Sequence, residues 1–172
     1  MVVVRPVEIS DVEAAARIHV GTWRSTYTGV IDQAYLDSLS YEAKAAQWKQ
    51  GIESNNTDIY RYVAESGGAV CGISIFGETR DQLSDADCEL YALYVSDAAQ
   101  GTGAGYALFA EAVSLLSSKG YRKMLIKVLK ENPKGIRFYE RQGCIAIGEA
   151  EIELDGQRYL DKFYVYPLRS SG

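Results

Sequence analysis

The stretch SDAAQGTGAGYALFAEAV, residues 96–113, places three glycines within five positions and follows them with a helical pattern of apolar residues. Glycine inside a helix costs about 1 kcal/mol relative to alanine, so this crowding marks a turn that needs bare backbone. The preceding CELYALYV, residues 88–95, is rich in aromatic and branched side chains and predicts a buried strand. A strand, a glycine-rich turn and then a helix are typical of a phosphate site, because the first N–H groups of a helix lack partners within it.

The spacing of these glycines excludes two common nucleotide motifs. A dinucleotide-binding turn needs G-x-G-x-x-G, but Tyr106 or Leu108 stands where the third glycine would be. A P-loop needs Gly-Lys and then Ser or Thr, and no lysine follows these glycines. The remaining pattern is Q-x-x-G-x-G, formed by Gln100, Gly103 and Gly105.

Around this turn, the sequence changes between strand-like and helical spacing. Alternating or β-branched runs predict strands at residues 2–9, 58–65, 69–77, 88–95, 122–129, 144–154 and 157–168. Turn signals at residues 66–68 (SGG) and 155–156 (DG) join two pairs of these strands into hairpins.

Helical spacing and capping residues predict the helices. The first begins at a capping box of Ser10 and Glu13. Its apolar stripe is Val12, Ala16, Val20, Trp23 and Tyr27. Further helices are predicted at residues 33–39 and 41–53, from the glycine stretch to about residue 119, and at residues 133–142. Asn132 is the expected cap of the last of these, with Pro133 in its first turn and Gly143 just past its end.

Length and composition predict one domain, residues 1–172, with 47% hydrophobic residues to build its core. No apolar run approaches the roughly 20 residues that a membrane span needs. The short apolar start, with a charge at Arg5, predicts a strand rather than a secretory signal, and the expected location is the cytoplasm. The net charge is −5 and no basic stripe occurs, which argues against a nucleic-acid partner.

The cysteine and histidine content argues against metal and triad chemistry. Cys71, Cys88 and Cys144 are far apart and form no CxxC pair, so neither a disulfide framework nor a zinc site is expected. His19 is the single histidine, so a His-rich metal site is excluded and a Ser-His-Asp triad has one candidate. Nothing around His19 in the sequence suggests an activated pair, and packing or capping is its expected role.

The glycine turn closely resembles the acyl-coenzyme A motif of the GNAT superfamily of N-acetyltransferases: Arg or Gln, two residues, Gly, one residue, then Gly or Ala. NPKGIRFYERQG, residues 132–143, resembles the second hallmark of that family, an Asn followed by an aromatic-Tyr pair, Glu, a basic residue and Gly. The element order is also similar over residues 3–166. Cys144 replaces the usual Phe, Gly135 replaces a common Ala, and a proline often found before the first motif is absent. None of these departures removes a group that the reaction needs.

The resemblance implies a single-domain α/β (α+β) GNAT fold, with a mixed, mostly antiparallel sheet of about six to seven strands flanked by helices. A V-shaped splay is expected between the fourth and fifth strands. The implied activity is acetyl-CoA-dependent N-acetyl transfer to a primary amine of a small molecule or to a protein amino group, by a monomer or homodimer. The acidic charge balance favours a cationic acceptor such as a polyamine. Two alternatives stay open: a non-catalytic acyl-CoA sensor or docking module, and transfer of succinyl or longer acyl groups.

By the same resemblance, backbone groups hold the cofactor. Those expected at the pyrophosphate are Gln100, Gly101, Thr102, Gly103, Ala104 and Gly105. Those expected beside the pantetheine arm, where N–H groups can also stabilise the oxyanion, are Leu93, Tyr94 and Val95. The side chain of Asn132 is expected to cap its helix, to contact the pantetheine arm, or to do both through water.

Two side chains are candidates for proton transfer. Tyr139 is the candidate general acid, because a phenol with a pKa near 10 can protonate a departing thiolate. Glu89 interrupts an apolar strand, where an unpaired carboxylate is costly, and is the candidate general base acting through water. The alternative for Glu89 is a strand-edge charge facing solvent or a Lys or Arg partner. Trp23 and Tyr27 are expected on the acceptor wall, although Trp23 also fits the core.

Overall fold

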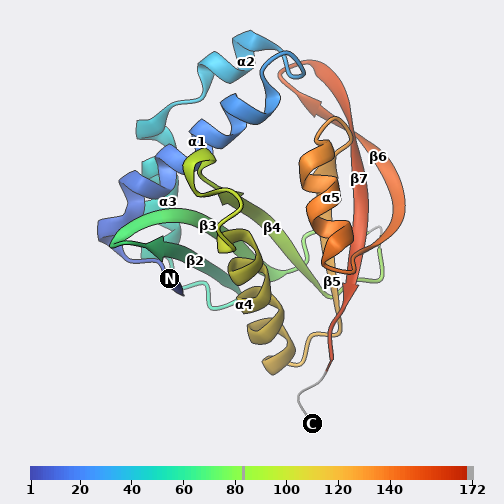
Figure 1. Ribbon diagram of the computed structural model, residues 1–172. Helices are drawn as coiled ribbons and strands as arrows, with labels where there is room; N and C mark the ends of the chain where they lie inside the picture. Colours follow the sequence, from blue (N-terminus) through green and yellow to red (C-terminus); the bar gives the residue numbers. More distant parts are fainter. Residues whose placement is uncertain (83, 170–172) are drawn as a thin grey trace.

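The computed structural model describes residues 1–82 and 84–169; residue 83 and residues 170–172, which fall within the predicted domain 1–172, lie outside the described residues. Seven strands of the described part form one sheet in the order β1-β2-β3-β4-β5-β7-β6 (Figure 1). Their bounds are β1 Val2–Pro6, β2 Ile59–Ser66, β3 Ala69–Glu78, β4 Cys88–Val95, β5 Lys123–Leu129, β6 Ile145–Leu154 and β7 Gln157–Pro167. β4 and β5 are parallel, and every other neighbouring pair is antiparallel. The predicted mixed, mostly antiparallel sheet is confirmed.

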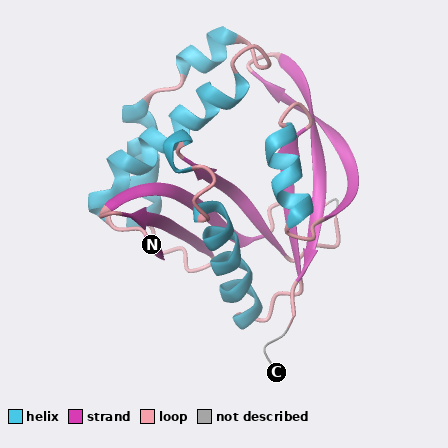
Figure 2. Cartoon of the chain, in the orientation of Figure 1, coloured by secondary structure: helices cyan, strands magenta, loops and turns pink. Residues whose placement is uncertain are grey.

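Helices cover both faces of the sheet (Figure 2). They are α1 Val12–Tyr27, α2 Gln33–Ser38, α3 Tyr41–Glu53, α4 Ala104–Ser118 and α5 Pro133–Arg141, with short 3₁₀ turns at Ile9–Asp11 and Asp97–Ala99. Val63 of β2 and Ile73 of β3 pack against α1 and α3. Ala64, the next residue along β2, packs against α4 on the other face, because side chains alternate across a strand. The predicted order of helices and strands is therefore confirmed.

The start of α1 differs from the prediction. Ser10 is exposed within the 3₁₀ turn, and the carboxylate of Asp11 accepts the backbone N–H of Glu8 at 2.8 Å. The guanidinium of Arg5 lies 2.8 Å from Asp11 and holds the pKa of that carboxyl below its usual range. The capping box is therefore formed by Glu8 and Asp11, two residues earlier, where the ion pair with β1 holds the Asp11 carboxylate, and the predicted capping box of Ser10 and Glu13 is wrong.

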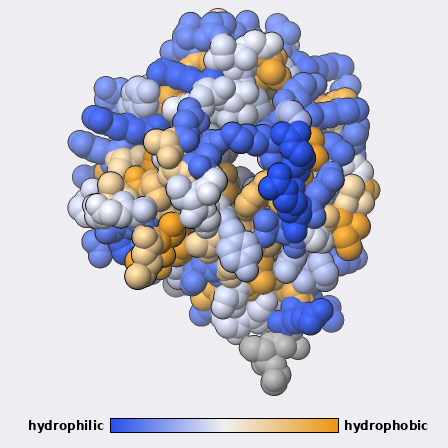
Figure 3. Space-filling view, viewed as in Figure 1, coloured by the Kyte–Doolittle hydropathy of each residue, from blue (hydrophilic) through white to orange (hydrophobic). Residues whose placement is uncertain are grey.

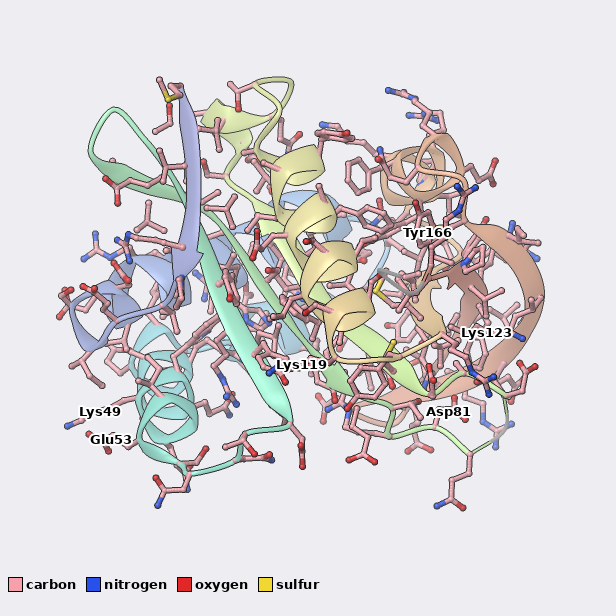
Figure 4. The ribbon with its side chains drawn as sticks, turned by 90° about the horizontal axis from the view of Figure 1, so that it is seen from below. Lys49, Glu53, Asp81, Lys119, Lys123 and Tyr166 are labelled. Carbon is pink, nitrogen blue, oxygen red and sulfur yellow. The ribbon has the colours of Figure 1, made fainter. Side chains whose placement is uncertain are left out.

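The first helix buries most, but not all, of its predicted stripe. Ala16, Val20 and Tyr27 are buried, whereas Val12 and Trp23 are only partly buried. Trp23 is partly exposed because it lines a cavity, and α1 runs toward α2 at this end (Figure 1). On the far side of the molecule, α3 turns charged side chains outward. Figure 4 shows Lys49 and Glu53 there, 3.9 Å apart and exposed.

β4 and β5 pair over a short length. Cys88–Leu90 pairs with Met124–Ile126, after which no further ladder joins the two strands. β4 continues to Val95 and β5 continues to Leu129. The two strands therefore part along their carboxyl-terminal halves (Figure 1), and the predicted V-shaped splay between the fourth and fifth strands is confirmed.

A β-bulge lies where the strands part. On the β3 side of β4, Phe76 pairs with Leu90 but Ile75 pairs with Ala92, so Tyr91 is the extra residue. A bulge bends its strand and increases the local twist. The hydroxyl of Tyr91 donates to the carbonyl of Glu78, which holds the bulged residue against β3. We infer that this bend directs β4 away from β5.

The side chains where β4 pairs with β5 are buried, and their packing stabilises the fold. We therefore predict that Ile126→Ala is strongly destabilising. Ile126 is 1% exposed and lies in the paired part of β5. Its truncation is expected to lower the free energy of unfolding by about 3 kcal/mol, from lost burial and a residual cavity. Urea denaturation measures this change. Ile147→Ala is the control, because Ile147 is 48% exposed on β6; an equal loss in both variants would contradict the assignment of the core.

Candidate active site

The parting of β4 and β5 opens into a cavity of about 740 Å³. Figure 3 shows this face of the molecule hollowed at its centre, between the glycine turn and α5. The predicted site residues that line the cavity are Trp23, Tyr27, Glu89, Leu93, Tyr94, Val95, Gln100, Gly101, Gly103, Gly105, Asn132 and Tyr139. Thr102 and Ala104 belong to the same turn but are not among the lining residues. The fold thus brings together side chains from α1, β4, the glycine turn and α5.

The conformation of the glycine turn explains why the sequence crowds glycines there. Gly101 has φ +80° and Gly103 has φ +91°, in the left-handed region that other residues rarely adopt. Gly103 is the N-cap residue of α4, which begins at Ala104. At Gly105 the reason is space, because an added Cβ would lie 3.3 Å from the ring of Phe138. The turn therefore needs glycine at positions 101 and 103, whereas a larger residue at position 105 would require a small shift of the Phe138 ring.

Five backbone N–H groups of this turn have no acceptor within the described residues. They belong to Gly101, Gly103, Ala104, Gly105 and Tyr106. Together with the positive end of the α4 dipole, these donors can bind an anion with several oxygens, such as a diphosphate. The N–H groups of Gln100 and Thr102 instead donate to Asp97 and Ala99 at 3.4 and 3.3 Å, within the turn.

A lysine that the sequence analysis missed lies beside this turn. The side chain of Lys134, at the start of α5, donates to the Oε1 atom of Gln100, and both residues line the cavity. The Nε2 atom of Gln100 donates to the carbonyl of Val95 at 3.4 Å. Lys134 brings a positive charge to the same end of the cavity as the free N–H groups. No sequence pattern links residues 100 and 134, because only the packing of α5 beside the turn brings them together.

The second half of β4 has one free edge. Leu93, Tyr94 and Val95 pair with β3, whereas beyond Leu90 no described strand pairs with the edge that faces the cavity. An unpaired strand edge offers alternating N–H and C=O groups to an extended chain. This edge can therefore bind an elongated amide-containing ligand as an added strand would.

Tyr139 enters the cavity from the α5 side. It is 7% exposed and its ring lies 5.2 Å from Phe138 and 6.3 Å from Phe109, between ring centroids. Burial is the main cause that raises the pKa of the Tyr139 phenol above its ordinary value. The hydroxyl is therefore protonated at neutral pH, which is the state that a proton donor requires.

Asn132 connects the two sides of the cavity. Its Oδ1 atom accepts the backbone N–H of Gly135 at 2.9 Å, which confirms the predicted cap of α5. Its Nδ2 atom donates to the hydroxyl of Tyr27 at 3.3 Å. The side chain thus links the start of α5 to α1. The contact of Asn132 with a pantetheine arm stays a prediction.

Aromatic side chains form the wall of the cavity on the α1 side. The indole of Trp23 donates to the hydroxyl of Tyr94 at 2.9 Å, and its ring lies 4.8 Å from the ring of Tyr27. Tyr27 is 7% exposed, and burial raises the pKa of its phenol. Trp23 therefore lines the cavity instead of lying fully in the core. We name Trp23, Tyr27 and Tyr94 the aromatic wall.

Glu89 lies near the closed end of the splay, in the paired part of β4. It is 3% exposed, and one carboxylate oxygen lies 3.7 Å from the guanidinium of Arg80. The other oxygen accepts the backbone N–H of Arg80 at 3.3 Å. The structure thus provides the arginine partner that the sequence left as an alternative, and Glu89 still lines the cavity. Arg80, from the loop after β3, was not among the predicted site residues.

His19 lies outside this cavity. It lines a separate cavity of about 170 Å³ together with Lys44 and Arg61, and its ring lies 4.8 Å from the ring of Tyr94. Burial, and then the charge of Lys44, lower the pKa of His19 to about 4. Its Nδ1 atom is buried and has no hydrogen-bond partner among the described residues. His19 therefore packs behind the aromatic wall, in agreement with its expected role.

The sequence of this chain is similar to those of known proteins. Residues 20–144 match the sequence model of the acetyltransferase (GNAT) family. The chain belongs to this family, which confirms the predicted resemblance and the predicted class of enzyme, an acyltransferase. The uncharacterized N-acetyltransferase YuaI of Bacillus subtilis is 34% identical over 158 residues, which cover 92% of this chain and 88% of YuaI. A spermidine N(1)-acetyltransferase of Thermoplasma acidophilum is 24% identical over 143 residues, which cover 81% of this chain and 86% of that protein.

A solved structure shows the same fold. The phosphinothricin acetyltransferase of Sinorhizobium meliloti, in complex with acetyl-CoA, superposes with a TM-score of 0.75 at 22% identity, covering 98% of this chain and 89% of that one.

Within residues 1–82 and 84–169, no helix is long and apolar enough to cross a membrane. The same residues contain no group of three His, Cys, Asp or Glu side chains that could hold a metal ion.

The backbone strain at Gly103 predicts that Gly103→Ala weakens the binding of coenzyme A. A Cβ at φ +91° costs on the order of 1 kcal/mol of stability. If the backbone shifts to relieve this strain, the free N–H groups of the turn change direction. The dissociation constant of coenzyme A, measured by calorimetry, is expected to rise on the order of tenfold. Gly120→Ala is the matched control, because Gly120 also has φ +91° but follows the far end of α4. Equal weakening by both variants would argue against an anion site at this turn.

The lowered pKa of His19 predicts a loss of stability in acid. Between about pH 6.5 and 4 the unfolded chain binds a proton on His19 that the folded chain does not. Stability therefore falls over this window. His19→Phe removes this effect and keeps an aromatic ring against Tyr94, so its loss of stability between pH 7 and pH 4.5 should be smaller by about 2 kcal/mol. Urea denaturation at both pH values measures the difference, and an identical loss in wild type and variant would contradict it.

Proposed function

We propose that this protein is an acetyl-CoA-dependent N-acetyltransferase that acts on a primary amine of a small molecule or on a protein amino group. One observation carries the proposal: the free N–H groups at the start of α4 and the buried phenol of Tyr139 line one cavity, between two parted strands. The free N–H groups can bind the diphosphate of coenzyme A. The phenol of Tyr139 can protonate the thiolate of coenzyme A that leaves when the thioester of acetyl-CoA is cleaved. Membership of the acetyltransferase family supports the same chemistry.

The residues present fit the cosubstrate along its length. The free N–H groups of Gly101, Gly103 and Gly105 are proposed to bind the pyrophosphate, and Lys134 adds a charge beside them. The pantetheine arm, which carries amides, is proposed to pair with the free edge of β4 at Leu93–Val95. Thr102 and Ala104 shape the turn, and the free N–H of Ala104 joins the donors.

The reaction needs a neutral amine, a polarised carbonyl and a proton for the leaving sulfur. The amine nitrogen attacks the carbonyl carbon, the C–N bond forms and the C–S bond breaks. A backbone N–H of the free β4 edge is proposed to stabilise the oxyanion. Tyr139 is proposed to give its proton to the thiolate, because burial keeps its phenol protonated at neutral pH.

The proton that the ammonium must lose needs a base. Glu89 is proposed to receive it through water, since its carboxylate lies on β4 and lines the cavity. The guanidinium of Arg80 lies 3.7 Å from this carboxylate, so Glu89 has a charged partner in its buried position. The aromatic wall at Trp23 and Tyr27 is proposed to hold the acceptor.

The proposed role of Tyr139 predicts that Tyr139→Phe lowers kcat while coenzyme binding is retained. Loss of a general acid typically costs about 10²- to 10⁴-fold in rate. Thiol release from acetyl-CoA in the presence of an amine measures kcat, and calorimetry measures the dissociation constant of coenzyme A. Tyr166→Phe is the matched control, because Tyr166 (labelled in Figure 4) also packs against Phe109 but does not line the cavity.

The same assay tests the function itself. The amine panel contains polyamines, aminoglycosides, amino acids and N-terminal peptides, and amine-dependent release of thiol is expected with at least one of them. Binding of acetyl-CoA without thiol release from any amine would favour the sensor predicted as the alternative. A flat thermal shift at millimolar acetyl-CoA would contradict both. Succinyl-CoA and longer acyl-CoA esters in the same assay test the acyl preference.

Several predictions from the sequence are retained as proposals. The acceptor is proposed to be cationic, on the basis of the net charge of −5 and of the relative named as a spermidine acetyltransferase. The cytoplasmic location, the single domain over residues 1–172, and the monomer or homodimer state are likewise retained.

A further inference from the structure

Within residues 1–82 and 84–169, each buried carboxylate except one forms an ion pair. Four acids of the described chain are 9% exposed or less: Asp11, Asp81, Glu89 and Asp161. Three of them form ion pairs, at the distances given: Asp11 with Arg5 (2.8 Å), Asp81 with Lys127 (2.9 Å) and Glu89 with Arg80 (3.7 Å). Such pairing is the rule, since an isolated buried charge is costly.

Asp161, on β7, is the exception. No hydrogen bond or ion pair to its carboxylate occurs among residues 1–82 and 84–169, although it is 9% exposed. The nearby cation is Lys127, whose ammonium is bound to Asp81 and lies 5.2 Å from the ring of Phe163. Burial raises the pKa of the Asp161 carboxyl, as expected for a charge without a close partner. Asp161 also lines the catalytic cavity.

The pairing register of β7 with β5 shows on which face of the sheet the side chain of Asp161 lies. Asp161 pairs with Leu129 of β5, so both side chains lie on one face of the sheet. Leu129 packs with Tyr27 and Trp23 of the aromatic wall. Tyr164, three residues further along β7, packs on the opposite face in the cluster that contains Tyr139. Asp161 and Tyr139 therefore approach the cavity from opposite faces of the sheet.

We propose that Asp161 binds a second, non-reacting ammonium group of the acceptor, which makes the substrate a diamine or a longer polyamine. This inference rests on the proposed acetyltransferase function. It assigns to Asp161 a role in specificity, distinct from the roles of Glu89 and Tyr139. The cavity supplies a carboxylate without a partner and, beside it, the faces of aromatic rings that attract cations.

The chemistry of the reaction explains why the bound group is not the nitrogen that reacts. An amine must lose its proton before it attacks the thioester, and a buried carboxylate stabilises the protonated form. A carboxylate in this position would therefore slow the reaction of an amine paired with it. A second ammonium stays charged throughout the reaction, so its ion pair with Asp161 holds the acceptor without opposing proton loss at the other end.

The test compares a diamine with a monoamine of the same length. 1,4-Diaminobutane and butylamine are titrated into protein saturated with coenzyme A, and their kcat and KM are measured with acetyl-CoA. Asp161→Asn is expected to weaken binding of the diamine by about 30-fold or more, the effect of removing one partner of a buried charge pair. Binding of butylamine and of coenzyme A should change less than about twofold.

Two further variants isolate the charge at this position. Glu153→Gln removes an exposed carboxylate from the same hairpin and should leave the diamine preference unchanged. Asp161→Glu retains the charge and should retain much of the preference. Because the carboxylate of Asp161 is unpaired, Asp161→Asn should melt at the same temperature as wild type or higher, which separates a loss of binding from a loss of folding.

Three outcomes would overturn the inference. The diamine affinity could be unchanged in Asp161→Asn, the diamine and monoamine could weaken equally, or Glu153→Gln could have the same effect as Asp161→Asn. The binding of coenzyme A by wild type, measured in the same samples, tests the proposed function separately. If coenzyme A does not bind, the proposed function fails, and titration of the diamine alone still tests whether Asp161 binds a cation.

Discussion

The short pairing between β4 and β5 is the constraint on which the site depends. Among the described residues, the strand ladder between the two halves of the sheet spans only Cys88–Leu90 and Met124–Ile126, and the bulge at Tyr91 lies just beyond it. A longer ladder between β4 and β5 would close the cavity and would occupy the N–H and C=O groups along the free edge of β4. Shorter pairing would leave the halves of the sheet joined only through side-chain packing. The junction therefore has a closed end that holds the fold and an open end that leaves backbone groups free.

In the proposed site, the two kinds of ligand approach the open end from the two faces of the sheet. On the face covered by α4 and α5 lie the glycine turn, Lys134 and Tyr139, which suit a polyanion and its leaving sulfur. On the other face lie the aromatic wall and Asp161, which suit a cation. The two partners of an acyl transfer can thus enter from opposite faces and meet where the strands part.

Two of the buried acids, Glu89 and Asp161, line the cavity. Glu89 and Asp81 are buried beside Arg80 and Lys127, so their charges are offset within the protein. Asp161 is buried and has no ion-pair partner among the described residues, and an unpartnered buried charge reduces stability. The free N–H groups at Gly101 and Gly103 lie in an exposed turn on the wall of the same cavity, where they are accessible to a ligand.

Local sequence determined much of this protein. The turn glycines, the Asn132 cap and the strands flanking each turn could be predicted because each depends on residues close in the chain. The Ser10 cap was wrong because an ion pair between Arg5 and Asp11 overrides the local signal. The tertiary structure alone decided which side chains meet: Lys134 beside Gln100, Arg80 beside Glu89, and Asp161 beside the aromatic wall. These contacts depend on sheet order and strand register, which bring residues far apart in sequence to one face, and no local pattern encodes them.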